Sequence, residues 1–321
     1  MIPFGKARGR RRPWHSCLVL LLLVWAMSTA HGDEPVGTLG VVGSDTMAGL
    51  MLRWGEQLSE RHPGIRLQLQ ASGSASAPTA LAAGTTRLGP MSRAMSDSER
   101  DAFQQRHGYP VLEVEVARDA LAVIVHRHHA LESLRLDEID AIFSTTRRCG
   151  GDEAILRWEQ LGVAGRGGRI ELNGRNPASG SFGLFRQQAL CGGSYNPRLN
   201  EHPGSAAVVA AVTESLEAIG YVGLNHLTPG IKALAIEDGE GRRHVPAAEP
   251  VRQGEYPLGR ALFLYVNLPP GEALSGPERA LLDLILSPQG QRTVSEMGFV
   301  ALSEEHLAAQ RELLGLDATL P

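Results

Sequence analysis

One pattern recurs along this chain and limits the folds that it can adopt. An apolar, strand-like run ends in glycine and serine, and a stretch with helical spacing follows. The pattern occurs at GSDTM (43–47), ASGSAS (71–76) and ASGSF (178–182), and MSRAMSDSE (91–99) again places Ser92 between a strand and a helix. Strands that alternate with helices predict an α/β fold with mainly parallel sheets. In such sheets, ligands bind outside the carboxyl ends of the strands, where these loops would lie.

The rest of the chain continues this alternation. We expect strands over residues 36–44, 65–70, 111–126 and 261–267, and Arg118 and Asp119 interrupt the third of these. Helices are expected over 47–58, Pro78–Ala83, Asp97–His107, 204–218, Pro277–Leu286, Gln289–Met297 and Glu304–Leu313. These strands are too many for one sheet, and no low-complexity linker divides the chain. We therefore expect two α/β lobes joined by strands that cross near 116–120 and 254–261.

The first 32 residues have the layout of a secretory signal peptide. MIPFGKARGRRRPW carries five basic residues and no acidic one, CLVLLLLVWAM is apolar, and STAHG supplies small residues. The apolar run is shorter than a bilayer-spanning helix requires, although a membrane anchor or a buried helix is the alternative. We therefore expect residues 1–32 to be a signal peptide that is cleaved after Ala30 or Gly32.

Without this segment the chain is acidic. Loss of its five basic residues leaves 26 Lys and Arg against 35 Asp and Glu, so the net charge is near −9. Such a surface repels nucleic acid and anionic lipid, and local hydrogen bonds must supply the affinity for any anion. The histidines show no metal-ligand spacing and no C-x-x-C motif occurs, so we predict neither a metal nor a cofactor. Cys149 and Cys191 are an isolated pair, which in an exported protein predicts one disulfide.

The glycine- and serine-containing loops suit a small anion. Helix N-termini present unpaired N–H groups, glycine permits close approach of the backbone, and serine or threonine adds a hydroxyl donor. Any one loop, taken singly, is better explained by ordinary helix capping. Arg175, however, stands just before the third loop, and its planar guanidinium can bind a tetrahedral oxyanion through two hydrogen bonds. A surface arginine paired with a carboxylate is the alternative, but the recurrence of the loops favours a binding site.

GSDTM, SGS after the second strand, LGPMSRAM, R-x-x-x-SGS, GSAAVVAAV, IGYVG and YPLGRALFLYVN occur in this order. The series resembles the phosphate-binding protein of bacterial phosphate-specific ABC import systems, over nearly the whole mature chain. The resemblance implies a two-lobed, type II periplasmic binding protein fold that closes on phosphate in the cleft between lobes. Lobe 1 would comprise 33–117 and 260–321, and lobe 2 would comprise 118–259. The protein would be a periplasmic monomer, not an enzyme, that delivers phosphate to permease subunits.

The resemblance also implies which residues bind phosphate. They are Ser44, Thr46, Ser72, Gly73, Ser74, Ser92, Arg93, Arg175, Ser179, Gly180 and Ser181. Some family members have an aspartate where this chain has Ser92 and Arg93, and that carboxylate accepts the phosphate proton. Asp45 and Asp119 are the candidates for this role here. Asp119 is expected instead to pair with Arg175, and either carboxylate could serve the structure alone.

Other functions remain open at this point. Sulfate, molybdate or a phosphorylated solute would suit similar loops. A secreted serine hydrolase needs a nucleophile, a base and an orienting acid, but the G-x-S-x-G motif is missing and His202, His226 and His244 have no supporting pattern. A scaffold or adhesion protein is a third alternative, which tight phosphate binding would argue against.

Overall fold

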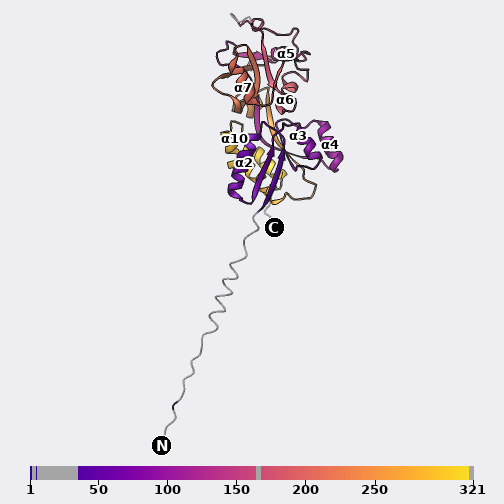
Figure 1. Cartoon of the computed structure of the whole chain (residues 1–321), viewed down its shortest axis with the longest axis vertical. Coiled ribbons are helices and arrows are strands. Elements are labelled where there is room, and N and C mark those ends of the chain that lie inside the picture. The colour runs from indigo at the N-terminus through magenta and orange to yellow at the C-terminus, as the bar shows by residue number, and fades with distance from the viewer. Residues whose placement is uncertain (2–4, 6–34, 164–167, 318–321) are drawn as a thin grey trace. The chain divides into compact units, whose positions relative to one another are not determined.

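The computed structural model describes residues 35–163 and 168–317, together with Met1 and Gly5. The chain from Val36 onward forms one compact unit, shown in Figure 1. Apart from Met1 and Gly5, the predicted signal peptide lies outside the described residues. Within the described ranges, none of the helices has the length and apolar character that a bilayer crossing requires.

A mixed sheet of nine strands, counted over the described residues, runs through this unit, so the expectation that the strands are too many for one sheet is wrong. Its order is β2-β1-β3-β12-β4-β8-β6-β7, and β9 pairs with the end of β4 on the side opposite β8. The bounds are β1 Gly37–Val42, β2 Ile65–Gln70, β3 Leu88–Met91, β4 Leu112–His126, β6 Glu171–Arg175, β7 Asn200–His202, β8 Ala218–Gly223, β9 Ile231–Ala233 and β12 Gly259–Val266.

The sheet has a parallel group of strands at each end and antiparallel strands in its middle. β1 is parallel to β2 and β3, and β6 is parallel to β7 and β8. β4 and β12 are antiparallel to each other, and each also pairs with one of the parallel groups. The predicted alternation of strands and helices is therefore confirmed within each group, whereas the middle of the sheet is antiparallel.

The expected interruption of β4 at Arg118 and Asp119 is wrong. β4 runs unbroken, pairing with β12 as far as Ala120 and with β8 from Leu121. Asp119 is tolerated inside the strand because Arg260 of β12 lies directly opposite in the ladder and forms an ion pair with it. A buried charge without a partner is strongly destabilising, and the ion pair removes that penalty here.

Helices cover both faces at the β1 end of the sheet. α2 (Ala48–Arg61) packs against α9 (Gly276–Ile285) and α10 (Pro288–Glu296), whereas α3 (Ser76–Ala82) packs with α4 (Asp97–His107). Figure 1 shows α2 with α10 on one side of the strands and α3 with α4 on the other. α4 has the predicted bounds because Ser96 forms a capping box with Glu99 and Gly108 ends the helix in the left-handed conformation.

The β6 end carries a second set of elements, which Figure 1 shows grouped around α5, α6 and α7. α7 covers only Ser205–Glu214 of the expected 204–218, because Ser215 adopts an extended conformation and leads into β8. The other elements are β5 Ser133–Arg135, α5 Leu136–Phe143, a 3-10 turn Trp158–Leu161, α6 Gly180–Gln188, a 3-10 turn Leu224–His226, β10 Ala235–Glu237, β11 Arg243–His244 and α8 Ala248–Gln253. α11 (Glu304–Leu313) belongs to the β1 end, where its Leu307 packs against the core around Trp54.

Two large apolar cores lie at the two ends of the crossing strands β4 and β12. The first surrounds Trp54 and ends on β4 at Ala117, and the second surrounds Trp158 and begins on β4 at Ala120. On β12 and the segment before it, the boundary between the two cores lies between Leu258, in the second core, and Leu262, in the first. The lobe boundaries themselves remain a prediction.

The predicted disulfide between Cys149 and Cys191 is confirmed. Their Cα atoms are 5.4 Å apart, and the bond joins residues 42 positions apart in the sequence. Both cysteines belong to the β6 end, since Cys149 follows α5 and Cys191 follows α6.

Candidate functional site

The loops after β1, β2 and β3 lie directly against one another. The backbone N–H of Gly73 donates to the carbonyl of Gly43 at 2.9 Å. The N–H of Ser92 donates to the Ser74 hydroxyl at 3.0 Å, and the hydroxyls of Ser74 and Ser92 are 3.2 Å apart. Three of the recurring loops therefore meet at one edge of the sheet, as the alternation of strands and helices predicts.

The loop after β6 joins this group from the other end of the sheet. The N–H of Ala75 donates to the carbonyl of Ala178 at 3.2 Å. Gly180, the first residue of α6, is so close to the other loops that a Cβ there would lie 2.3 Å from the Ser92 hydroxyl and 2.5 Å from that of Ser74. Only glycine permits this approach, so the N-terminus of α6 lies directly above the Ser74 and Ser92 hydroxyls.

Four serine hydroxyls of the site accept hydrogen bonds from fixed N–H groups. The backbone N–H of Met47 donates to the Ser44 hydroxyl at 3.4 Å, that of Ser92 to Ser74 at 3.0 Å, and that of Ser181 to Ser179 at 3.2 Å. Nη1 of Arg260 donates to the Ser181 hydroxyl at 2.8 Å. A hydroxyl that already accepts such a bond keeps its own proton for donation. These serines are therefore prepared as hydrogen-bond donors, which is what an oxyanion requires.

Arg175 is held in a buried position at the end of β6. Its side chain is 1% exposed, and its Nη2 donates to an Asp45 carboxylate oxygen and, at 2.9 Å, to the Pro203 carbonyl. Nη1 donates to the Ser205 hydroxyl at 3.1 Å. These bonds orient the guanidinium while leaving part of its donor capacity unused, since the group has five N–H bonds.

Three buried polar atoms near this guanidinium have no hydrogen-bond partner among the described residues. They are Asp45 Oδ1, Thr46 Oγ1 and Arg175 Nε. Buried polar atoms are nearly always satisfied in folded proteins, so such a group indicates a ligand or ordered water. Together the three atoms offer an acceptor, a hydroxyl and a cationic donor, a set that matches an oxyanion carrying one proton.

The expected pairing of Asp119 with Arg175 is wrong. Asp119 accepts from Arg260 Nε at 3.0 Å and from the Leu224 N–H at 3.3 Å, whereas Arg175 pairs with Asp45. The reason is strand register, because Asp119 and Arg260 are opposite each other on β4 and β12. The sequence analysis therefore did not identify Arg260. The signal for the pair was a single arginine at the start of the apolar strand β12 and a single aspartate inside the apolar part of β4.

Two of the expected site residues direct their polar groups elsewhere. Ser72 is exposed, and its hydroxyl accepts from the Gln70 side chain at 3.3 Å. Arg93 forms two hydrogen bonds of 2.7 Å with the Glu99 carboxylate on α4. Burial alone would raise the pKa of Glu99, but the bonds from Arg93 and the Ser96 N–H outweigh it and the pKa lies below its usual range. The charge of Arg93 is therefore already neutralised.

The surroundings of the site keep several titratable groups neutral. Burial raises the pKa of Tyr221 to about 12, so its hydroxyl stays protonated. This hydroxyl accepts a hydrogen bond from the backbone N–H of Arg175 at 3.2 Å. Burial, aided by nearby Arg175, lowers the pKa of His202. Burial also lowers the pKa of His226, although Asp119 opposes the shift while Arg175 and Arg260 add to it. These shifts favour the uncharged forms of Tyr221, His202 and His226 at neutral pH.

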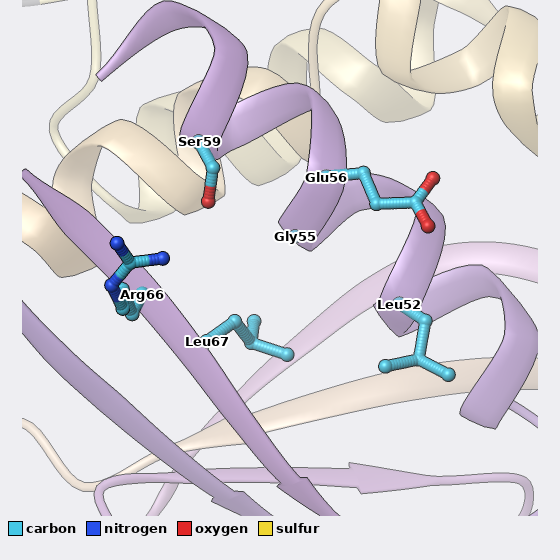
Figure 2. Close-up of a pocket in the computed structure, with 6 residues that line it drawn as sticks. All are labelled: Leu52, Gly55, Glu56, Ser59, Arg66 and Leu67. Carbon is cyan, nitrogen blue, oxygen red and sulfur yellow. The ribbon is translucent and has the colours of Figure 1, made fainter. Parts of the chain in front are cut away.

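One surface pocket lies away from this site. It has a volume of about 350 Å³ and lies between α2 and β2. Figure 2 shows its lining residues Leu52, Gly55, Glu56 and Ser59 on α2 and Arg66 and Leu67 on β2. None of the predicted site residues lines this pocket. Likewise, the residues described include no group of three or more His, Cys, Asp and Glu side chains that could hold a metal ion.

Comparison with known proteins gives a consistent set of relatives. Residues 28–288 match the model of the PBP superfamily domain. The phosphate-binding protein PstS of Pseudomonas aeruginosa is 42% identical over 283 residues, which cover 87% of this chain and 88% of that protein. The phosphate-binding protein PstS of Bacillus subtilis is 26% identical over 279 residues, which cover 86% of this chain and 85% of that protein.

Solved structures share the fold. A phosphate ABC transporter substrate-binding protein from Clostridium perfringens with bound phosphate has a TM-score of 0.70 at 21% identity, covering 83% of this chain and 100% of its own. An ABC-type phosphate transport receptor from Vibrio cholerae has a TM-score of 0.65 at 18% identity, covering 82% and 99% respectively.

Proposed function

This chain belongs to the PBP superfamily and, within it, to the family of the phosphate-binding protein PstS, and on that premise we propose that it captures inorganic phosphate for import. Its fold class is the predicted one, the α/β fold of type II periplasmic binding proteins. In this proposal the mature protein is a monomer in the periplasm, is not an enzyme, and delivers phosphate to the permease subunits of an ABC importer.

The observation that most directly supports phosphate as the ligand is the set of three buried atoms without a partner among the described residues: Asp45 Oδ1, Thr46 Oγ1 and Arg175 Nε. Arg175 Nε and the serine hydroxyls would donate to the phosphate oxygens, together with the N–H groups at the start of α6. Asp45 Oδ1 would accept the proton that phosphate carries at neutral pH. Sulfate has no such proton, so its oxygen would face the Asp45 carboxylate without a hydrogen between them. Asp45 thus takes the role of acceptor in a chain whose loop after β3 has Ser92 and Arg93.

Closure around the ion follows from where the donors originate. Ser44, Thr46, Ser74 and Ser92 belong to loops at the β1 end, whereas Arg175 and α6 belong to the β6 end. An ion that contacts both ends stabilises the arrangement in which they are close together, because it binds that arrangement more tightly. We propose that the permease recognises this closed form.

The hydrolase alternative gains no support from the histidines near the loops. His202 Nε2 is 3.0 Å from the Asn173 side-chain oxygen, and His244 Nε2 is 2.9 Å from an Asp238 carboxylate oxygen. The site hydroxyls accept hydrogen bonds from N–H groups instead of donating to an imidazole base, so the arrangement favours binding over nucleophilic attack.

Calorimetric titration of the mature protein with phosphate, arsenate, sulfate and molybdate tests the proposal. We expect phosphate and arsenate to bind and sulfate not to bind. Arg175→Ala should weaken phosphate binding by about 2–5 kcal/mol, since it removes one partner of a buried charged contact. Arg186→Ala is the matched control, because Arg186 is an exposed arginine on α6.

Asp45→Asn tests the role of the carboxylate. The amide keeps the shape of the side chain but removes the charge that repels sulfate, so the preference for phosphate over sulfate should shrink at least tenfold. Equal binding of phosphate and sulfate by the unmodified protein would contradict the proposed function. An unchanged preference in Asp45→Asn would instead reject Asp45 as the proton acceptor.

A further inference from the structure

We propose that Arg260 is a positioning residue of this site, which holds the Ser181 hydroxyl so that its proton is directed to the bound oxyanion. The inference rests on the proposed function and adds a residue and a role to it. Arg260 lies near the start of β12, its side chain is 1% exposed, and it is joined to parts of the chain from both ends of the sheet.

All three nitrogens of the Arg260 guanidinium have partners within the protein. Nε and Nη2 donate to an Asp119 carboxylate oxygen, the former at 3.0 Å. Nη1 donates to the Ser92 carbonyl at 3.3 Å and to the Ser181 hydroxyl at 2.8 Å. Arg175 Nε, by contrast, has no hydrogen-bond partner in the part of the chain that the structure describes. Arg260 is therefore placed to fix other groups, whereas Arg175 is placed to contact a ligand.

The bond to Ser181 determines what that hydroxyl can do. A hydroxyl has one proton, and an oxygen that accepts from a guanidinium cannot also point its proton at that cation. The proton must therefore point away from Arg260. Charge-assisted donors also make stronger hydrogen bonds than neutral ones, so this orientation is held firmly. Without Arg260, the hydroxyl would lose this bond and its proton would no longer be held in one direction.

Asp119 offsets the cost of burying the Arg260 charge. Its side chain is 0% exposed, and it accepts from the Leu224 N–H as well as from Arg260. The carboxylate neutralises the guanidinium and fixes its orientation, so Arg260 adds no net charge that would bind sulfate and phosphate alike. The Arg260 fork thereby connects the loop after β3 with the start of α6, two of the segments that would enclose the ion.

A double-mutant cycle between Arg260→Lys and Ser181→Ala tests this assignment. Lysine keeps the positive charge opposite Asp119 but lacks the planar fork that reaches Ser92 and Ser181. We expect each single variant to weaken phosphate binding about tenfold, and the double variant to be no weaker than either single one, because both remove the same donated bond. The matched control is the cycle with Ser44→Ala, whose hydroxyl is oriented by Met47 instead, and there the two effects should add.

Thermal unfolding of each variant separates orientation from folding. If Arg260→Lys does not fold, the paired variant Asp119→Asn/Arg260→Gln removes both charges and takes its place in the same cycle. Additive effects with Ser181→Ala, or unchanged affinity in Arg260→Lys, would overturn the role of Arg260 while leaving phosphate binding intact. Failure of the unmodified protein to bind phosphate or arsenate would instead reject the proposed function, and this inference with it.

Discussion

Asp45 and Asp119 show how two aspartates near one site acquire different tasks. Each pairs with a buried arginine, Arg175 and Arg260 respectively. Asp119 is enclosed in the middle of the sheet and has partners on both oxygens, so it serves to hold Arg260. Asp45 keeps one oxygen without a partner among the described residues, so it can accept a proton from a ligand. The difference depends on the remaining hydrogen-bonding capacity of each carboxylate and not on residue type.

His226 provides a prediction at the residue scale. Because burial lowers its pKa in the folded protein, the unfolded chain binds more protons below the ordinary histidine pKa of 6.5. The free energy of unfolding is therefore fully retained above pH 6.5 and falls as the pH decreases below that value, by at most about 1.4 kcal/mol per pH unit for this group. His202 acts in the same direction.

Urea unfolding between pH 5 and pH 8, at about one-unit steps, measures this dependence. His226→Gln should have a shallower slope below pH 6.5 than the unmodified protein, and His128→Gln, at an exposed position, serves as the control. A slope that His226→Gln leaves unchanged would contradict the buried, neutral state of His226.

At the scale of elements, the N-terminus of α6 is the part that joins the loops into one site. Ser179 caps the helix by accepting from the Ser181 N–H, and Gly180 follows where other loops are within van der Waals contact. The helix thus brings its unpaired N–H groups to the hydroxyls of Ser74 and Ser92. The crossing strands β4 and β12 also help to join the loops into one site. Their register places Asp119 beside Arg260.

Gly180→Ala tests this close approach. The added Cβ would meet the Ser92 and Ser74 hydroxyls at 2.3 Å and 2.5 Å, so α6 and the two loops must separate. We expect phosphate affinity to fall at least tenfold, measured by calorimetry, with a smaller effect on thermal stability. Gly204→Ala is the matched control, because a Cβ there has no atom within 4 Å. Normal affinity in Gly180→Ala would show that α6 does not need this contact.

At the scale of the whole molecule, two apolar cores and the strands between them carry the site. The Asp119–Arg260 ion pair is at the junction, where β4 leaves the first core at Ala117 and enters the second at Ala120. The stability of each core and the binding of the ion are therefore separable properties. The disulfide offers a way to change one without the other, because Cys149 and Cys191 are both near the second core.

Reduction of the Cys149–Cys191 bond should lower the free energy of unfolding by about 2–4 kcal/mol, since the unfolded chain regains the freedom of a long loop. Phosphate affinity should stay within about twofold, because neither cysteine contacts the site loops. Urea unfolding and calorimetry with and without reductant measure the two quantities. The double variant Cys149→Ser/Cys191→Ser should be insensitive to reductant. Loss of binding at unchanged stability would contradict this separation.

Local sequence determined which segments form the elements and which loops carry donors. Ser96, Glu99 and Gly108 are sufficient to define α4, because capping depends on residues only a few positions apart. The pattern of glycine and serine after strands likewise indicated Ser74, Ser92 and Gly180, since parallel strands bring their carboxyl ends to one edge.

Only the tertiary structure decided which charges pair and which hydroxyls point inward. Asp119 and Arg260 are 141 positions apart, and Asp45 and Arg175 are 130 apart, so each pairing depends on strand register and core packing that no local pattern contains. Ser72 and Ser74 occur in the same loop, but the turn at Gly73 exposes one and buries the other. Local propensities act over a few residues, whereas electrostatic partners are chosen by the folded sheet.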